Sequence, residues 1–239
     1  MKLNKNHWLY TTKIAHRGLW NEAIPENSLP AYQNAVDNNY AIEIDVYKTK
    51  DNKIVVFHDK TLDRMTGVEG NIFDKTLSEL KSLRLFGTDN TIPTLSEVLK
   101  VVDGKTPLLI EIKDQPDKTI VEDTVNILKN YKGDFALQSF NPLYINKVKK
   151  LAPEMIRGIL GTASENTLKG IKYKIVKDLL LNFLIKPQFI SYDFKDLPLK
   201  KRKVKKLPLL AWTITNDIDY AITKKYCDNV IFENFIPKD

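Results

Sequence analysis

The sequence is poor in cysteine and has no long apolar segment. Cys227 is the single cysteine among 239 residues, which excludes an internal disulfide framework and a cysteine-rich zinc site. The longest apolar cluster, LLLNFLI at 179–185, is much shorter than the roughly 20 residues of a membrane-spanning helix. The first residues, MKLNKNHWLYTTKIAHRG, are basic but lack the apolar core of a signal peptide. We therefore expect a cytoplasmic protein.

The sequence also lacks any feature that would divide it. We find no linker rich in proline, glycine or serine, no low-complexity tract and no internal repeat, and this length suits one α/β barrel. A composition of 43% hydrophobic and 28% charged residues is that of an ordinary globular protein. The net charge of +7 favours anionic partners, namely phosphate esters, nucleic acid or an anionic membrane surface.

Short β-rich runs alternate with segments of helical periodicity along the whole chain. The β-rich runs are 14–16, 42–46, 54–58, 108–113, 135–140, 156–160, 189–192, 209–214 and 230–232. The helical segments are 27–38, 94–102, 118–131, 142–151, 168–185, 197–206 and 217–226. Alternation of this kind indicates a parallel sheet.

One of these runs is too many for a (β/α)8 barrel. Only seven residues separate the runs 42–46 and 54–58, whereas parallel neighbours need a crossover of about a dozen residues or more. The intervening KDN favours a turn, so we predict that 54–58 returns antiparallel to 42–46. The eight other runs predict a (β/α)8 TIM barrel. We expect a single domain over 1–239, with an insertion at about 47–92 that holds one weak helix near 77–83.

The run AIEIDVY contains two acids that a buried strand would not ordinarily hold. Side chains alternate along a strand, so Glu43 and Asp45 point to the same side, with Cα atoms about 6.5–7 Å apart. In the run LLIEIKD, Glu111 and Lys113 share a side in the same way. A divalent cation would relieve the repulsion among the three carboxylates, and hard oxygen donors suit Mg²⁺ or Ca²⁺. The alternative is that the acids face outward and pair with helix lysines.

Two of the three histidines end predicted strands. His16 ends the first run in IAHRG, and His58 ends the returning run in VVFHD. The predicted hairpin brings His58 back beside Asp45, and therefore close to the proposed cation. Two imidazoles beside a cation suit general acid–base catalysis near neutral pH. A structural role is the alternative for this pair, and it is the role we expect for His7.

Two basic side chains adjoin these groups. Arg17 follows His16, and Lys113 accompanies Glu111. Either could hold phosphate oxygens, the arginine through its bidentate fork and the lysine as a point charge.

The order of the motifs resembles that of the glycerophosphodiester phosphodiesterase family. The motifs are HRG (16–18), PENS (25–28), EID (43–45), FHD (57–59), LDRMTG (62–67), IPTLSEVL (92–99), IEIK (110–113), QSFNP (138–142) and AWTI (211–214). The ordered match extends from residue 14 to about residue 232. The resemblance implies a TIM barrel with a small insertion after the second strand, in agreement with the strand count.

The resemblance also implies residue roles. It makes His16 and His58 the acid–base pair, Glu43, Asp45 and Glu111 the ligands of Mg²⁺ or Ca²⁺, Arg17 and Lys113 the phosphate contacts, Glu26 and Asn27 supports of the site, and Trp212 a residue that lines the substrate groove. Ser28 stands where the family commonly has threonine. IFENFIP at 231–237 replaces its frequent TDxP ending, which leaves the substrate preference open.

The reaction implied is metal-dependent hydrolysis of glycerophosphodiesters, such as glycerophosphocholine or glycerophosphoethanolamine, to glycerol 3-phosphate and an alcohol. In it the glycerol 2-hydroxyl attacks phosphorus, one histidine takes its proton and the other protonates the leaving alcohol. Water then opens the cyclic phosphate. The alternative enzyme is a lysophospholipase D-like phosphodiesterase. A non-catalytic phosphate-binding protein is disfavoured because both histidines and all three acids are present.

A basic segment remains, LKKRKVKKL at 199–207, in which six of nine residues are basic. Its place between two predicted strands favours the solvated face of a barrel helix. Transient contact with an anionic membrane surface is the alternative. No aromatic residue is interleaved with these lysines, so we expect no nucleic-acid partner.

Overall fold

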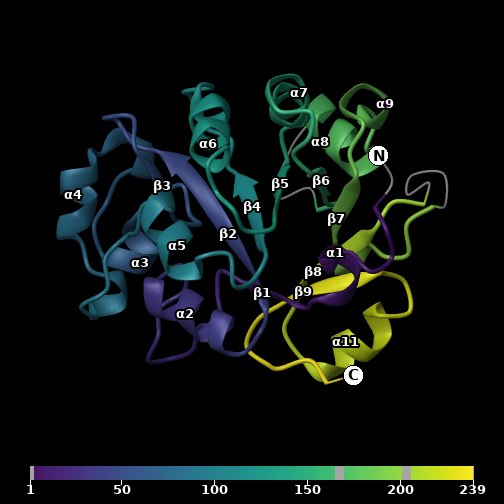
Figure 1. The fold of residues 1–239 in the computed structure, drawn as a ribbon, viewed down its shortest axis with the longest axis horizontal. Helices are drawn as coiled ribbons and strands as arrows, with labels where there is room; N and C mark the ends of the chain where they lie inside the picture. The colour runs from purple at the N-terminus through teal and green to yellow at the C-terminus, as the bar shows by residue number, and fades with distance from the viewer. Residues whose placement is uncertain (1–2, 165–169, 201–205, 239) are drawn as a thin grey trace. The chain divides into compact units, whose positions relative to one another are not determined.

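Nine β-strands are present among residues 3–164, 170–200 and 206–238, which the computed structural model describes (Figure 1). They are β1 (Ile14–His16), β2 (Ala41–Lys48), β3 (Ile54–Val56), β4 (Leu108–Ile112), β5 (Phe135–Ser139), β6 (Arg157–Gly161), β7 (Phe189–Asp193), β8 (Leu209–Ile214) and β9 (Asn229–Phe232). Each lies within one residue or two of a predicted run.

The helices connect these strands. They are α1 (Trp8–Thr11), α2 (Leu29–Asp37), α3 (Asp63–Thr66), α4 (Leu77–Ser82), α5 (Leu95–Val102), α6 (Ile120–Leu128), α7 (Pro142–Leu151), α8 (Gly170–Asp178), α9 (Asn182–Ile185) and α11 (Asp217–Thr223), with short 3₁₀ turns η1 (Ile72–Asp74), η2 (Leu85–Gly87) and η3 (Phe194–Asp196). Capping boxes start α4 and α5, in which Thr76 and Thr94 satisfy the first-turn N–H groups.

The strand order confirms the predicted barrel. It is β1-β9-β8-β7-β6-β5-β4-β2-β3, and β1 also pairs with β2. The eight strands other than β3 therefore close into a parallel (β/α)8 barrel. The short connection after β2 does return antiparallel, with Val46 opposite Val56 and Lys48 opposite Ile54, as the seven-residue spacing predicts.

Two helix predictions need correction. Within the predicted helix 168–185, the described residues 170–185 form two helices rather than one, because Leu179 has a left-handed backbone (φ 52°) between α8 and α9. The predicted helix 197–206 does not begin at its first residues, since 197–200 are not helical; 201–205, which include most of the basic segment, lie outside the described residues. Across the described ranges, no helix is both long and apolar enough to cross a membrane.

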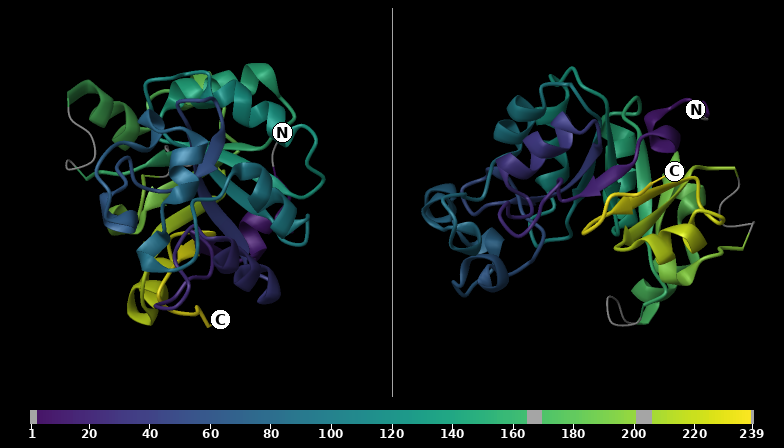
Figure 2. Two further views of the ribbon diagram at one scale, coloured as in Figure 1. Left: turned by 90° about the vertical axis from the view of Figure 1, so that its left-hand side faces the viewer. Right: turned by 90° about the horizontal axis from the view of Figure 1, so that it is seen from below.

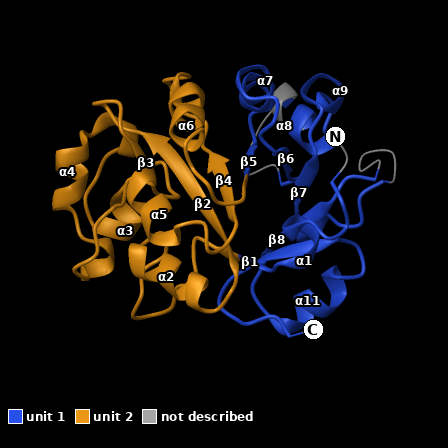
Figure 3. Ribbon diagram, viewed as in Figure 1, with its two compact units in different colours: residues 1–14, 136–239 blue, residues 15–135 orange. Residues whose placement is uncertain are grey.

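The chain comprises two compact units (Figure 3). Unit 1 consists of residues 1–14 and 136–239, and unit 2 of residues 15–135. Unit 2 holds β2, β3, β4 and every predicted site residue except Trp212. The prediction of a single domain over 1–239 is not tested by this division and stays a prediction.

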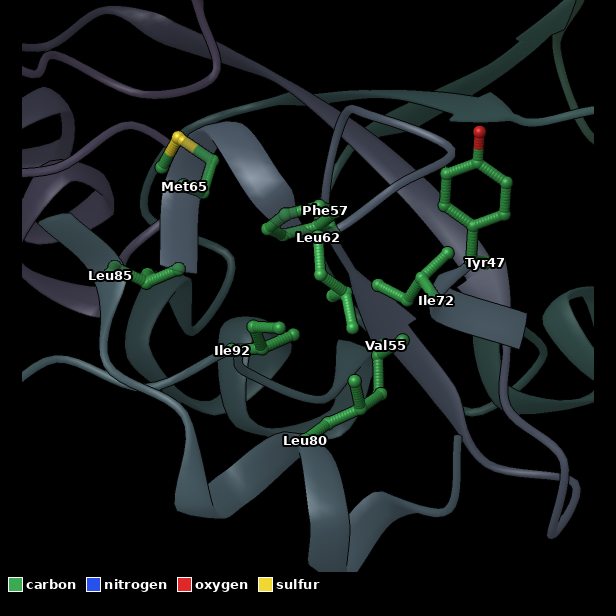
Figure 4. Close-up of a cluster of buried hydrophobic side chains, with 9 residues drawn as sticks. All are labelled: Tyr47, Val55, Phe57, Leu62, Met65, Ile72, Leu80, Leu85 and Ile92. Carbon is green, nitrogen blue, oxygen red and sulfur yellow. The ribbon is translucent and has the colours of Figure 1, made fainter. Parts of the chain in front are cut away.

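The insertion after β2 has a hydrophobic core of its own, within unit 2 (Figure 4). Its buried side chains are Tyr47, Val55, Phe57, Leu62, Met65, Ile72, Leu80, Leu85 and Ile92. They come from the β2–β3 hairpin and from the short helices that follow it, drawn in blue in Figure 2. The predicted helix near 77–83 is α4. Because this core is continuous with the hairpin, it fixes the chain that leaves β3.

The motif LDRMTG forms α3 and its ends. Leu62 and Met65 face the insertion core, and Gly67 ends the helix with φ 71°, a left-handed conformation that glycine adopts without strain. Arg64, between the two buried residues, keeps a side chain that is 43% exposed. The motif thus contains two core residues, a glycine that ends the helix, and Arg64, whose side chain is partly exposed.

We predict that Leu62→Ala destabilises the protein by about 2–5 kcal/mol, the usual cost of truncating a buried leucine. Leu62 is fully buried, whereas Leu143 on α7 is 62% exposed, so Leu143→Ala is the matched control and should change stability by less than about 0.5 kcal/mol. Urea unfolding of both variants provides the measurement. Equal stability losses would show that the insertion core contributes nothing beyond surface packing.

Candidate active site

Three carboxylates meet on β2 and β4. The strands run parallel with Asp45 opposite Glu111, and the two-residue period of β2 sets Glu43 on the same side. The carboxylate oxygens of Glu43, Asp45 and Glu111 lie within 4.8 Å of one another, and all three residues are buried. Lys113, one residue beyond β4, places Nζ 2.8 Å from Asp45 Oδ1 and 3.1 Å from Glu111 Oε1.

The electrostatics of this cluster are unbalanced. Burial, together with the charges of Asp45 and Glu111, raises the pKa of Glu43 well above its usual range. Burial also raises the pKa of Glu111, against the attraction of Lys113. For Asp45, burial opposes ionisation, but the charges of Lys113, His58 and Arg17 together outweigh it and the pKa falls below its ordinary value. One ammonium therefore contacts two of the three acids, Asp45 and Glu111, and among the three only Asp45 has a lowered pKa.

A divalent cation fits these residues. Carboxylate oxygens are the hard donors that Mg²⁺ and Ca²⁺ prefer, and a doubly charged ion would offset the repulsion that, together with burial, raises the pKa of Glu43. Glu43, Asp45 and Glu111 are the residues that could hold it.

Both predicted histidines lie beside the carboxylates. His16 ends β1, and its Nε2 is 3.9 Å from Glu43 Oε2. His58 follows β3, and its ring centroid lies 6.3 Å from that of His16 in an edge-to-face arrangement. The β2–β3 hairpin continues one residue past β3, where Phe57 N donates to Asp45 O at 2.9 Å. This hydrogen bond brings the next residue, His58, to the cluster.

The turn after His16 requires unusual backbone. Arg17 and Gly18 have φ values of 60° and 84°, and a Cβ on Gly18 would lie 2.9 Å from the Cβ of Ala31 on α2. Glycine is therefore required at this position on both counts. The turn directs Arg17 N toward Glu43 Oε2, to which it donates at 3.3 Å.

Asn27 connects this turn to the carboxylates. Its backbone N donates to Arg17 O at 2.9 Å, and its Nδ2 donates to Asp45 Oδ2 at 3.4 Å. Its Oδ1 accepts from the hydroxyl of Tyr32 at 2.8 Å. Tyr32 is fully buried on α2 and holds the amide of Asn27. Sequence reasoning missed it, and the only signal was a tyrosine hydroxyl on a buried helix face, which must find a partner.

Glu26 and Asp59 carry a second set of ion pairs. Glu26 Oε1 accepts from Arg17 Nη1 at 2.8 Å and from Arg64 Nη2 at 2.6 Å, while Oε2 accepts from Arg64 Nη1 at 3.0 Å. Asp59 Oδ2 accepts from Arg64 Nε at 2.6 Å, and its Oδ1 lies 2.6 Å from His58 Nδ1. Burial opposes ionisation of Asp59, but the hydrogen bonds from His58 and Arg64 hold its pKa below the ordinary value.

Asp59 and Arg64 were not singled out from the sequence as site residues, although both lie within quoted motifs. An ionised carboxylate only accepts hydrogen bonds, so His58 Nδ1 must donate to Asp59. Nε2 of His58 is then the nitrogen that remains for proton exchange.

Trp20 belongs to unit 2, whereas Trp212, the predicted groove residue, belongs to unit 1. Trp20 donates from Nε1 to His16 O at 3.1 Å, which attaches it to the HRG turn. Trp212 lies in β8 of unit 1, where its ring contacts Phe140 edge to face at 5.7 Å. Its role in lining a substrate groove stays a prediction.

Taken together, the unit 2 residues combine an oxygen-rich cation site with two imidazoles and two basic side chains. A cation and an ammonium beside a reacting group stabilise negative charge, and imidazoles exchange protons near neutral pH. This combination suits hydrolysis of a phosphate ester.

Comparison with known proteins agrees with this chemistry. Residues 16–236 match the Glycerophosphoryl diester phosphodiesterase family. A glycerophosphodiester phosphodiesterase of Caldanaerobacter subterraneus subsp. tengcongensis is 38% identical over 164 residues, which cover 63% of this chain and 66% of that protein. YhdW of Bacillus subtilis, named as a candidate glycerophosphodiester phosphodiesterase, is 32% identical over 248 residues, which cover 95% of this chain and 96% of that protein.

Further matches differ in extent. Lysophospholipase D GDPD1 of Rattus norvegicus is 34% identical over 134 residues, 51% of this chain and 42% of that protein. The solved structure of an Oleispira antarctica phosphodiesterase in complex with its product sn-glycerol-3-phosphate matches with a TM-score of 0.76 and 25% identity, over 94% of this chain and 93% of that one. The family predicted from the motif order is thus confirmed. The chain belongs to the glycerophosphoryl diester phosphodiesterase family and is a phosphoric diester hydrolase.

Proposed function

We propose that the protein hydrolyses glycerophosphodiesters, such as glycerophosphocholine and glycerophosphoethanolamine, to glycerol 3-phosphate and an alcohol, with Mg²⁺ or Ca²⁺ as cofactor. The observation that carries the proposal is the pair of imidazoles, 6.3 Å apart, beside the buried cluster of Glu43, Asp45 and Glu111. The solved relative that holds sn-glycerol-3-phosphate as its product supports the same product here.

The basic residues bind and orient the phosphodiester. Lys113 uses donors toward Asp45 and Glu111 and, with three ammonium protons, retains one for a phosphate oxygen. Arg17 is held by Glu26 through Nη1, and the planar guanidinium suits contact with phosphate oxygens. A divalent cation on the carboxylates would supply further neutralisation of phosphate charge.

The histidines move the protons. One imidazole removes the proton of the glycerol 2-hydroxyl, whose oxygen attacks phosphorus, and the other protonates the departing alcohol oxygen. A five-membered cyclic phosphate results. Water then opens it with the two roles exchanged. His58 takes part through Nε2, since Asp59 holds its Nδ1.

The direct test is release of glycerol 3-phosphate from glycerophosphocholine by the purified protein, with Mg²⁺, with Ca²⁺ and with excess chelator. Release that needs the metal supports both the reaction and the cofactor. Release that persists in chelator would overturn the cofactor, and absence of release under every condition would overturn the substrate class.

The second candidate function is cleavage of lysophospholipids in the manner of a lysophospholipase D. It is favoured by the similarity to lysophospholipase D GDPD1 over half of this chain. Transient contact of the basic segment 199–207 with an anionic membrane would assist this reaction and, like the cytoplasmic location, stays a prediction. Cleavage of lysophosphatidylcholine without cleavage of glycerophosphocholine would favour this function over the first.

We predict that His16→Ala and His58→Ala each lower kcat by about 10²-fold or more, the scale of a general acid or base. His7→Ala is the control of the same residue type, since His7 caps α1 through Nδ1. Steady-state kinetics with glycerophosphocholine measures all three. A near-normal kcat in either site variant would remove that histidine from the acid–base pair.

We predict that Glu43→Gln weakens metal binding while it relieves repulsion in the metal-free protein. The Mg²⁺ or Ca²⁺ concentration that gives half of the rise in Tm should increase by more than about 10-fold, the scale on which even outer-shell partners of a metal act. The metal-free Tm should not fall, because burial and the neighbouring carboxylates, which raise the pKa of Glu43, already disfavour its charged form. Glu154→Gln, at an exposed glutamate, is the control. If Glu43→Gln left the metal concentration for half of the rise in Tm unchanged, Glu43 would not be a metal ligand.

A further inference from the structure

The guanidinium of Arg64 lies between two carboxylates. Nε donates to Asp59 Oδ2 at 2.6 Å, while Nη1 and Nη2 form a bidentate pair with Glu26 at 3.0 and 2.6 Å. Each carboxylate then reaches one further residue, since Asp59 bonds His58 Nδ1 and Glu26 accepts from Arg17 Nη1. A continuous chain of hydrogen bonds therefore runs from His58 to Arg17 through one arginine.

This arginine is held by a rigid support. It belongs to α3, a single turn whose neighbours Leu62 and Met65 are buried in the insertion core. Thr66 Oγ1 donates back to Leu62 O at 2.9 Å, and Gly67 N closes the turn on Asp63 O at 2.8 Å. The position of the guanidinium is therefore set by the packed core of the insertion.

The carboxylates of Glu26 and Asp59 depend on the Arg64 guanidinium for hydrogen bonds and charge. Glu26 is only 5% exposed, and a buried carboxylate is costly unless cations or hydrogen-bond donors surround it. Asp59 Oδ1 bonds Nδ1 of His58, and the second oxygen of Asp59 accepts from Arg64 Nε. Without that tie the carboxylate can rotate about its own side-chain bonds, and the imidazole loses the fixed acceptor that selects its tautomer.

We propose that Arg64 is a positioning residue for the reaction and acts through His58 and Arg17. By binding Asp59 it keeps Nε2 of His58 as the proton-exchanging atom, and by binding Glu26 it keeps the Arg17 guanidinium in place for phosphate. The inference rests on the proposed function of these two residues. The insertion core thus holds α3 in place, and Arg64 on α3 orients His58 through Asp59.

The first test is the effect of Arg64→Ala on glycerophosphocholine hydrolysis at saturating metal. We expect kcat to fall about 10- to 100-fold, the scale of a small misplacement of a catalytic group, together with a rise in KM from the loosened Arg17. Arg84→Ala is the matched control: Arg84 is an exposed arginine of the same insertion whose guanidinium donates to the backbone carbonyls of Lys81 and Leu83. A kcat equal to that of Arg84→Ala would overturn the proposal.

The second test separates positioning from stability. With only three histidines in the chain, ¹⁵N-histidine NMR resolves His58, which the spectrum of His58→Ala assigns. The wild type should show the Nδ1–H tautomer and Arg64→Ala a mixture of tautomers, whereas a purely stabilising ion pair would leave the tautomer unchanged and overturn the proposal. Wild-type protein without activity would instead count against the proposed function alone, because the tautomer shift is measured without substrate.

A conservative variant covers the case in which Arg64→Ala does not fold. Arg64→Lys keeps one positive charge beside Glu26 but cannot bridge two carboxylates with a planar fork. It should fold with a Tm close to that of Arg84→Ala and still lose at least about 10-fold in kcat. Full kcat in Arg64→Lys would show that charge alone suffices and would overturn the positioning role.

Discussion

Mutual repulsion among three buried carboxylates is the constraint on which the rest of this site depends. The register of β2 and β4 places Glu43, Asp45 and Glu111 together, and burial removes the water that would otherwise screen them. Lys113 lies against two of the three. Its charge, with those of His58 and Arg17, lowers the pKa of Asp45, whereas burial keeps the pKa values of Glu43 and Glu111 raised. Two further segments supply donors to this cluster, Arg17 N to Glu43 and Asn27 Nδ2 to Asp45.

Those donors come at a cost in backbone conformation. Arg17 and Asn27 are non-glycine residues with φ values of 60° and 53°. Such conformations cost of order 1–3 kcal/mol each and persist only where the surrounding structure imposes them. Here they allow Arg17 N to reach Glu43 and Asn27 Nδ2 to reach Asp45. The packing of Gly18 against α2 and the bond from Tyr32 hold the two turns in place. The left-handed backbone at the HRG and PEN turns therefore accompanies the hydrogen bonds that these turns donate to the buried acids Glu43 and Asp45.

Sequence periodicity was sufficient to predict where the strands lie and that the carboxylates share one side. Side chains alternate along a strand with a period of two, and the barrel requires eight parallel strands. The hairpin followed from a seven-residue spacing, and the hairpin placed His58. The Arg64 network could not be predicted in this way: it joins Glu26 to a residue 38 positions later, from segments without periodicity. The break between α8 and α9 depends on a left-handed Leu179, a conformation that leucine does not signal.

The charges of the linked side chains connect these features. The network contains five carboxylates, on Glu26, Glu43, Asp45, Asp59 and Glu111, and three permanent cations, on Arg17, Arg64 and Lys113. Two positive charges are missing, which is the charge of one divalent cation. The side chains of Arg17 and Arg64 pair with Glu26 and Asp59, so Lys113 is the cation in contact with the other acids. Burial and the neighbouring carboxylates raise the pKa of Glu43, and burial raises that of Glu111. A cation held by these carboxylates would favour the ionised form of Glu43, so cation binding would release the protons that its raised pKa retains. The insertion contributes to this balance as well, since Arg64 pairs with Glu26 and Asp59, and Glu43, Asp45 and Glu111 remain as the acids that could hold a cation.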